Sequence, residues 1–180
     1  MIASSDVPRV DYRDRLDPKP YLASHRALAA CAREFARLSE VVVEGVAALV
    51  AGGVEEKAVV RQSPGRCIVQ LGPVALTVAW LRSTLDSVEA GELLVILWRG
   101  AVAPRTKLRP ERTLEGPAPI AATALHEQVF LAVAESEESW TWQPADGAGP
   151  RRSSTELADS WVERLRQAYD ESPRPERSTT

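Results

Sequence analysis

The chain has 180 residues, 44% of them hydrophobic and 26% charged, and a formal net charge of -3 at pH 7. This length and composition predict one soluble globular domain that can bury a core without disulfides or metals. The acidic balance disfavours nucleic acid as the main partner, because proteins that bind the phosphate backbone usually carry a basic excess. The longest apolar runs, such as LLVILW at 93–98, are too short to cross a membrane.

The two cysteines, Cys31 and Cys67, fall in different predicted elements and have no CxxC spacing. The polar N-terminal sequence does not have the pattern of a secretory signal peptide. We therefore predict two buried thiols in a cytoplasmic protein.

The N-terminal part predicts an irregular leader over 1–17 and then one long helix, opened by Lys19-Pro20 and stopped by Gly52-Gly53. Apolar residues recur along it at helical spacing: Leu28, Cys31, Phe35, Leu38, Val42 and Leu49. A helix of about 30 residues is about 45 Å long. A sheet of about six strands is only about 25–30 Å across, so we expect the helix to overhang the sheet or to be covered by something else.

Three valines widen the second half of the helical stripe: Val41, Val43 and Val46. They are candidate partner-binding residues, which would face a second copy of the chain or another protein. The alternative is that the helix bends or breaks at Gly45 and packs entirely within its own domain.

The middle of the chain changes to a period of two, which predicts about six mostly antiparallel strands. Turn residues separate the first three strands, at Ser63-Pro64-Gly65 and at Gly72-Pro73. The predicted strands lie at 58–62, 66–72, 74–82, 92–100, 125–133 and around WTWQ, 140–143. The strand over 92–100 is apolar on both faces, which is typical of a central strand.

The strand over 74–82 alternates bulky and small residues. Its bulky face, which includes Trp80, is predicted to be core, and its small face would meet either a helix or water. If the strand over 92–100 pairs with it in an even register, Trp80 and Trp98 share a face. A slip of one residue reverses that arrangement.

The last element is predicted to be an amphipathic helix that begins at a capping box, Ser153 and Glu156. Its apolar residues repeat every four positions: Leu157, Trp161, Leu165 and Tyr169. Residues 171–180 are predicted to be a disordered tail. The fold class is therefore α+β, a single domain over 18–170 with both helices packed on one sheet face.

Trp140 and Trp142 point the same way if they lie in a strand. Exposed, the pair would bind a ligand or anchor a partner. Buried, it would complete the core beside Trp80 and Trp98, and we favour this interpretation because each buried indole removes a large apolar area from water.

A basic stretch lies in the predicted loop over 100–123 and just before it: Arg99, Arg105, Lys107, Arg109 and Arg112. These five cations are a candidate anion-binding site for phosphate, RNA or an acidic protein. The interpretation we favour is a solvated loop that balances acidic residues elsewhere.

No pattern predicts catalysis, a metal site or a cofactor. The histidines, His25 and His126, stand in different elements, and Glu127 next to His126 points to the other side of a strand. Histidines and cysteines together lack zinc-ligand spacing, and no glycine-rich phosphate loop is present.

The sequence therefore predicts a non-enzymatic module that binds protein, acting as an adaptor, a chaperone or an immunity protein through its long helix or a sheet face. Self-association as a homodimer is compatible with this role. Two alternatives stay open: a small-molecule sensor with a pocket between sheet and helices, and an RNA- or phosphate-binding module that uses the basic stretch.

Overall fold

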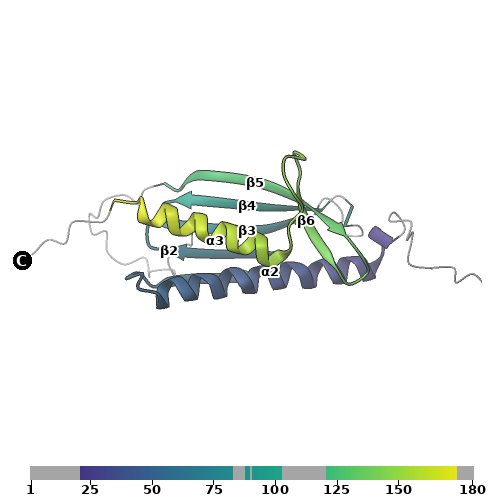
Figure 1. Cartoon of the computed structure of the whole chain (residues 1–180), viewed down its shortest axis with the longest axis horizontal. Helices are drawn as coiled ribbons and strands as arrows, with labels where there is room; N and C mark the ends of the chain where they lie inside the picture. Colours follow the sequence, from purple (N-terminus) through teal and green to yellow (C-terminus); the bar gives the residue numbers. More distant parts are fainter. Residues whose placement is uncertain (1–20, 83–87, 90, 103–120, 174–180) are drawn as a thin grey trace, which may run out of the picture.

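A computed structural model describes residues 21–82, 88–89, 91–102 and 121–173 of the chain (Figure 1). It confirms the α+β class: helix α2 (His25–Ala51), a six-stranded antiparallel sheet, and helix α3 (Ser154–Asp170). The strands are β1 (Ala58–Ser63), β2 (Arg66–Leu71), β3 (Val74–Arg82), β4 (Gly91–Arg99), β5 (Thr123–Ala134) and β6 (Trp140–Pro144). Their order in the sheet is their order in the chain, so each strand pairs with its sequence neighbour.

Helix α2 begins at His25, and a turn at Ala23 and Ser24 separates it from Tyr21 and Leu22, which are also helical. Ser24 is the N-cap: its backbone is extended, and its hydroxyl accepts a hydrogen bond from the amide of Ala27 at 3.2 Å. A short side chain that satisfies an otherwise unpaired first-turn amide is the usual way in which a helix starts. The predicted opening at Lys19-Pro20 lies outside the described residues, and the interruption at Ser24 was not predicted.

The pleat of the sheet divides its residues into two faces. Val69, Leu76, Val95 and Phe130 are buried in one hydrophobic core together with the apolar stripes of α2 and α3. The residues between them in each strand point to the opposite side. Ala75, Ala79 and Ile96 on that side are buried as well, but they are not part of this core. Both helices therefore cover the same sheet face, as predicted.

Trp80 and Trp98 lie on opposite faces of the sheet. Trp80 is in register with Leu93 across the β3–β4 pair, and Ala75 is in register with Trp98. The expectation of a shared face depended on an even register and is wrong. The small face of β3 was expected to meet a helix or water, but in the described structure it contacts Trp98 of the neighbouring strand. The indole Nε1 of Trp98 donates to Thr77 Oγ1 at 3.0 Å, and Thr77 is buried.

Helix α2 is continuous through Gly45 and does not break there. A Cβ atom added at Gly45 would lie 3.1 Å from a methyl group of Val162 in α3. The missing side chain thus allows the two helices to approach closely. Of the two interpretations of the long helix, the structure supports packing within its own domain, but without the break at Gly45 that this interpretation included.

The 27-residue helix α2 is about 40 Å long at the usual rise, and the chain's own β5–β6 hairpin covers its first turns (Figure 1). The hydroxyl of Tyr21 donates to the carbonyl of Glu137 at 3.0 Å, and Arg26 forms an ion pair with the Glu137 carboxylate at 2.6 Å. Tyr21 also contacts the ring of Trp140, with 6.1 Å between centroids. The expected overhang is therefore covered within the molecule at this end.

Helix α3 begins with the predicted capping box. The Ser153 hydroxyl accepts from the Glu156 amide at 3.3 Å, and the Ser153 amide donates to the Glu156 carboxylate at 2.8 Å. At the other end Ser172 is buried, and its hydroxyl donates to the carbonyl of Ala168 at 2.7 Å. The first residues of the predicted tail over 171–180 are therefore packed on the helix. Residues 174–180, like the leader over 1–17, lie outside the described residues.

Candidate functional site

The sheet face opposite the two helices is the candidate functional site, and we call it the open face. Its large apolar side chains are Val59 on β1, Ile68 on β2, Leu81 on β3, Leu94, Ile96 and Trp98 on β4, and Val129, Leu131 and Val133 on β5. Neither described helix packs against it. Residues at the centre of this face, among them Ala75, Thr77 and Ile96, are buried, so its exposed apolar side chains lie around that centre.

Exposed apolar side chains concentrate on the open face. Four large hydrophobic side chains are exposed among the described residues, and three of them belong to it: Val59 at 47%, Leu81 at 41% and Leu131 at 39%. The fourth is Val60, at 39%, which points to the helix side from the edge strand. Leu81 and Leu131 both lie in register with Glu92, on either side of it.

The charged side chains of the open face balance. Arg61 and Arg66 on β1 and β2 oppose Glu92 and Glu127 on β4 and β5. A phosphate-binding surface needs a local basic excess, and these strands do not provide one. Charges of both signs together with exposed aliphatic side chains are compatible with a protein–protein interface.

One end of the open face is fixed by Gln70. Its amide nitrogen donates to the carbonyls of Gly72, Val74 and Gly100 at 2.8–3.1 Å, and its amide oxygen accepts from the Val102 amide at 3.0 Å. Satisfying both ends of the amide holds the side chain in one orientation. The chain that leaves β4 is thereby attached to β2 across the end of β3.

The residues predicted to bind a partner lie mostly inside the molecule. Val46, Trp140 and Trp142 are buried in the core, and Val41 and Val43 are half-buried against it. The structure therefore agrees with our preferred interpretation, in which Trp140 and Trp142 belong to the core. It does not agree with an exposed binding surface formed by these two indoles. The valines of α2 likewise pack within their own domain, because α3 and the sheet cover that side of the helix.

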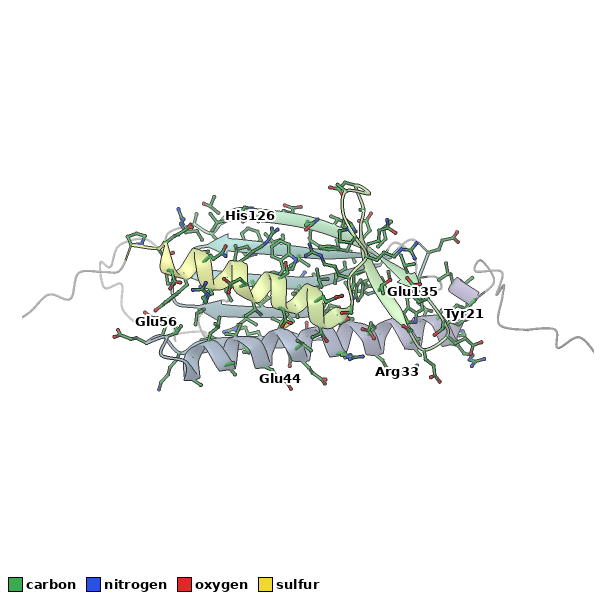
Figure 2. All side chains as sticks on the ribbon, viewed as in Figure 1. Tyr21, Arg33, Glu44, Glu56, His126 and Glu135 are labelled. Carbon is green, nitrogen blue, oxygen red and sulfur yellow. The ribbon has the colours of Figure 1, made fainter. Side chains whose placement is uncertain are left out.

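The side of α2 that faces solvent is polar. Figure 2 shows Arg33 and Glu44 pointing away from the sheet, and both are exposed. A partner that recognised α2 would have to bind this charged side instead of the predicted valines.

The basic stretch is described only at its beginning. Arg99 is the last residue of β4 and is exposed. Arg105, Lys107, Arg109 and Arg112 lie outside the described residues, so their grouping into an anion site stays a prediction.

The histidines are not brought together. His25 is the first residue of α2 and His126 lies in β5, where Figure 2 shows it at the margin of the sheet far from Tyr21. No group of three or more metal-binding side chains occurs within the described residues. His126 and Glu127 point to opposite faces of the sheet, as the strand period predicts.

Both cysteines are buried, as predicted. Burial raises the pKa of the Cys67 thiol, and the hydrogen bond with Gln62 offsets only part of that effect. A thiol held in its neutral form is a poor nucleophile, so Cys67 has a structural role in the core.

Two larger hollows lie on the helix side of the molecule. A wide one, about 970 Å³, lies where α2 ends and is lined by residues that include Glu55, Arg166 and Tyr169. A smaller one, about 330 Å³, lies between α2 and the β1–β2 turn.

Comparison with known proteins identified no relative: no family model, no curated protein and no solved structure matches the chain. Within the described residues, no helix has the length and apolar content needed to cross a bilayer.

The sequence predicts binding through the long helix or a sheet face, but it does not identify the residues of the open face. The signal was present in β5, where apolar residues occupy both parities of the strand: Phe130 and Ala132 on one side, Val129, Leu131 and Val133 on the other. A strand of this kind is covered on both sides, or it offers one side to a partner.

Proposed function

We propose that this protein is a non-catalytic module that binds another protein through the open face of its sheet. The observation that supports the proposal is the segregation of exposed aliphatic side chains: Val59, Leu81 and Leu131 lie on the one face that neither helix covers. Exposed apolar groups that share a surface are a common mark of an interaction site.

Protein fits this surface better than nucleic acid does. The two arginines and two glutamates on its strands cancel, so the face lacks the positive potential that attracts phosphates. Exposed aliphatic side chains together with charges of both signs are compatible instead with a protein interface. The partner is a second protein chain or another copy of this one, and the chain would act as an adaptor, a chaperone or an immunity protein in the cytoplasm.

The experiment is affinity capture from cells that express the tagged full-length chain, followed by reconstitution with the purified partner. Leu131→Glu places a carboxylate on the open face at one of its exposed apolar side chains, in register with Glu92 of β4. Val60→Glu is the matched control, because Val60 is also a strand residue and is also 39% exposed but points to the helix side. We expect the wild type and Val60→Glu to retain the same partner, and Leu131→Glu to lose it.

Three results would decide the proposal. A partner lost only with Leu131→Glu supports it, and so does a dimer of the chain itself that dissociates only with that variant. Equal binding by both variants, or the absence of any partner and of self-association, would contradict it. Thermal unfolding of both variants checks that each is folded, since a glutamate on an already exposed side chain should change stability little.

A further inference from the structure

The smaller hollow, on the helix side of the molecule, has the features of a binding site that is separate from the open face. We call it the turn cavity. It encloses about 330 Å³ between the first half of α2 and the β1–β2 turn and is lined by Phe35, Ser39, Glu40, Gln62, Arg66 and Trp80, together with small residues of both elements. This volume is at the lower end of the range for small-molecule sites, and it suits a molecule with one or two fused rings.

One wall of the turn cavity is a rigid aromatic ring. The indole of Trp80 packs edge-on against Trp142 with 5.9 Å between centroids, and a Cβ atom added at Gly91 would collide with it. The Trp80 backbone amide also donates to the carbonyl of Gly65, in the turn itself, at 2.7 Å. The backbone of β4 and the core thus hold this wall in place before any ligand arrives, which reduces the entropy lost on binding.

A polar group at the turn cavity has no partner within the described part of the chain. Ser39 lines the cavity, its side chain is buried, and its Oγ makes no hydrogen bond there. Buried hydroxyl groups are nearly always hydrogen-bonded in folded proteins. A ligand with a donor or acceptor on its edge would satisfy this group.

Glu40 of α2 is exposed at the mouth of the turn cavity and disfavours an anionic ligand, whereas Arg66, although it lines the cavity beside the turn, lies on the open face of β2. The apolar walls formed by Phe35 and Trp80 would remove water from a charged group of either sign, which costs free energy. The lining therefore favours an uncharged ligand whose ring contacts Phe35 and Trp80 and whose polar edge reaches Ser39.

From these features we infer that the turn cavity binds a small, uncharged aromatic molecule with a hydrogen-bonding edge, of about the size of indole. The site uses the helix side of the sheet, so the inference is independent of the proposed function and survives its failure.

The test is an NMR titration of the full chain, which follows the five indole NH signals while indole or toluene is added. Toluene is the matched probe without a polar edge. Ser39→Ala removes the hydroxyl, and Ala36→Leu fills the cavity from α2. Ala47→Leu is the control for Ala36→Leu, since both alanines are exposed on α2 and Ala47 lines none of the described cavities.

We expect a saturable shift of the Trp80 signal with indole, at least about ten-fold weaker binding with Ala36→Leu, and unchanged binding with Ala47→Leu. Ser39→Ala should weaken indole several-fold and leave toluene unchanged. The inference is overturned if Trp80 shows no saturable shift at millimolar indole, if both leucine variants bind alike, or if Ser39→Ala affects the two probes equally. Unfolding curves of the variants separate loss of binding from loss of fold.

Discussion

At the scale of single residues, a short chain of buried hydrogen bonds joins three elements. The indole Nε1 of Trp142 in β6 donates to Ser154 Oγ at the start of α3 at 2.8 Å, and Ser154 Oγ donates to the carboxylate of Glu34 in α2 at 2.5 Å. Ser154 is fully buried. Because each partner would be left with an unpaired group if the hydroxyl were removed, this serine should contribute more to stability than its size suggests.

Ser154→Ala is therefore predicted to lower the free energy of unfolding by about 1–3 kcal/mol, measured by urea denaturation. Ser39→Ala is the matched control: it also removes a buried serine hydroxyl, but one without a partner in the described structure. Its loss should leave stability unchanged or raise it. Equal destabilisation by both variants would mean that the Trp142–Ser154–Glu34 bonds contribute nothing specific.

The capping box predicts a dependence of stability on pH. The backbone amide of Ser153, and secondly its hydroxyl, lower the pKa of Glu156 in the folded state. A carboxylate whose pKa falls on folding adds stability above the unfolded-state pKa, and this contribution is lost as the pH falls through the folded-state value. The window therefore lies below about pH 4.3.

Glu156→Gln and Ser153→Ala should each make the loss of stability between neutral pH and this acidic window smaller than in the wild type. The measurement is the free energy of unfolding of the three proteins at several pH values. Parallel curves for all three would show that the box does not titrate as described.

At the scale of elements, the close approach of the two helices depends on Gly45. Leucine at this position would drive its side chain into Val162 of α3, since even a Cβ atom there would be only 3.1 Å away. Overpacking of this kind usually costs about 1–3 kcal/mol. The helix crossing is therefore predicted to be more sensitive at Gly45 than at any solvent-facing position of α2.

Gly45→Leu should accordingly lower the melting temperature, and Val162→Ala should restore part of the loss when the two changes are combined. Ala47→Leu, on the solvent side of the same helix, should have little effect. Additive destabilisation in the double variant, measured by calorimetry, would show that the two residues do not compete for the same space.

The elements were also what the sequence predicted best. Alternation of apolar residues located all six strands, and Ser153 with Glu156 located the start of α3, because both signals are local. The relation of Trp80 to Trp98 could not be derived, since register depends on how two strands pair and one residue of slip reverses a face. The role of Gly45 needed the position of Val162, which is 117 residues away in the chain (162 − 45).

The candidate sites were predicted less well for the same reason. Val46, Trp140 and Trp142 are apolar and buried. A sequence alone does not say whether an apolar residue lies in the core or on a binding surface. The open face and the turn cavity each combine residues from several elements, so neither has a local motif.

At the scale of the whole molecule, the protein is two-sided. Two helices and the core occupy one face of a six-stranded sheet (Figure 1). Aliphatic side chains and balanced charges occupy the other. The central claim is that the second face binds a protein. The turn cavity, on the first side, leaves that claim unaffected.

The most direct measurement is photo-crosslinking in cells that express the chain, with a photoreactive amino acid in place of either Leu131 or Val60. The two positions are equally exposed, at 39%, and point to opposite faces. We predict a discrete protein adduct from position 131 and none from position 60. No adduct from position 131, or the same adduct from both positions, would contradict the account.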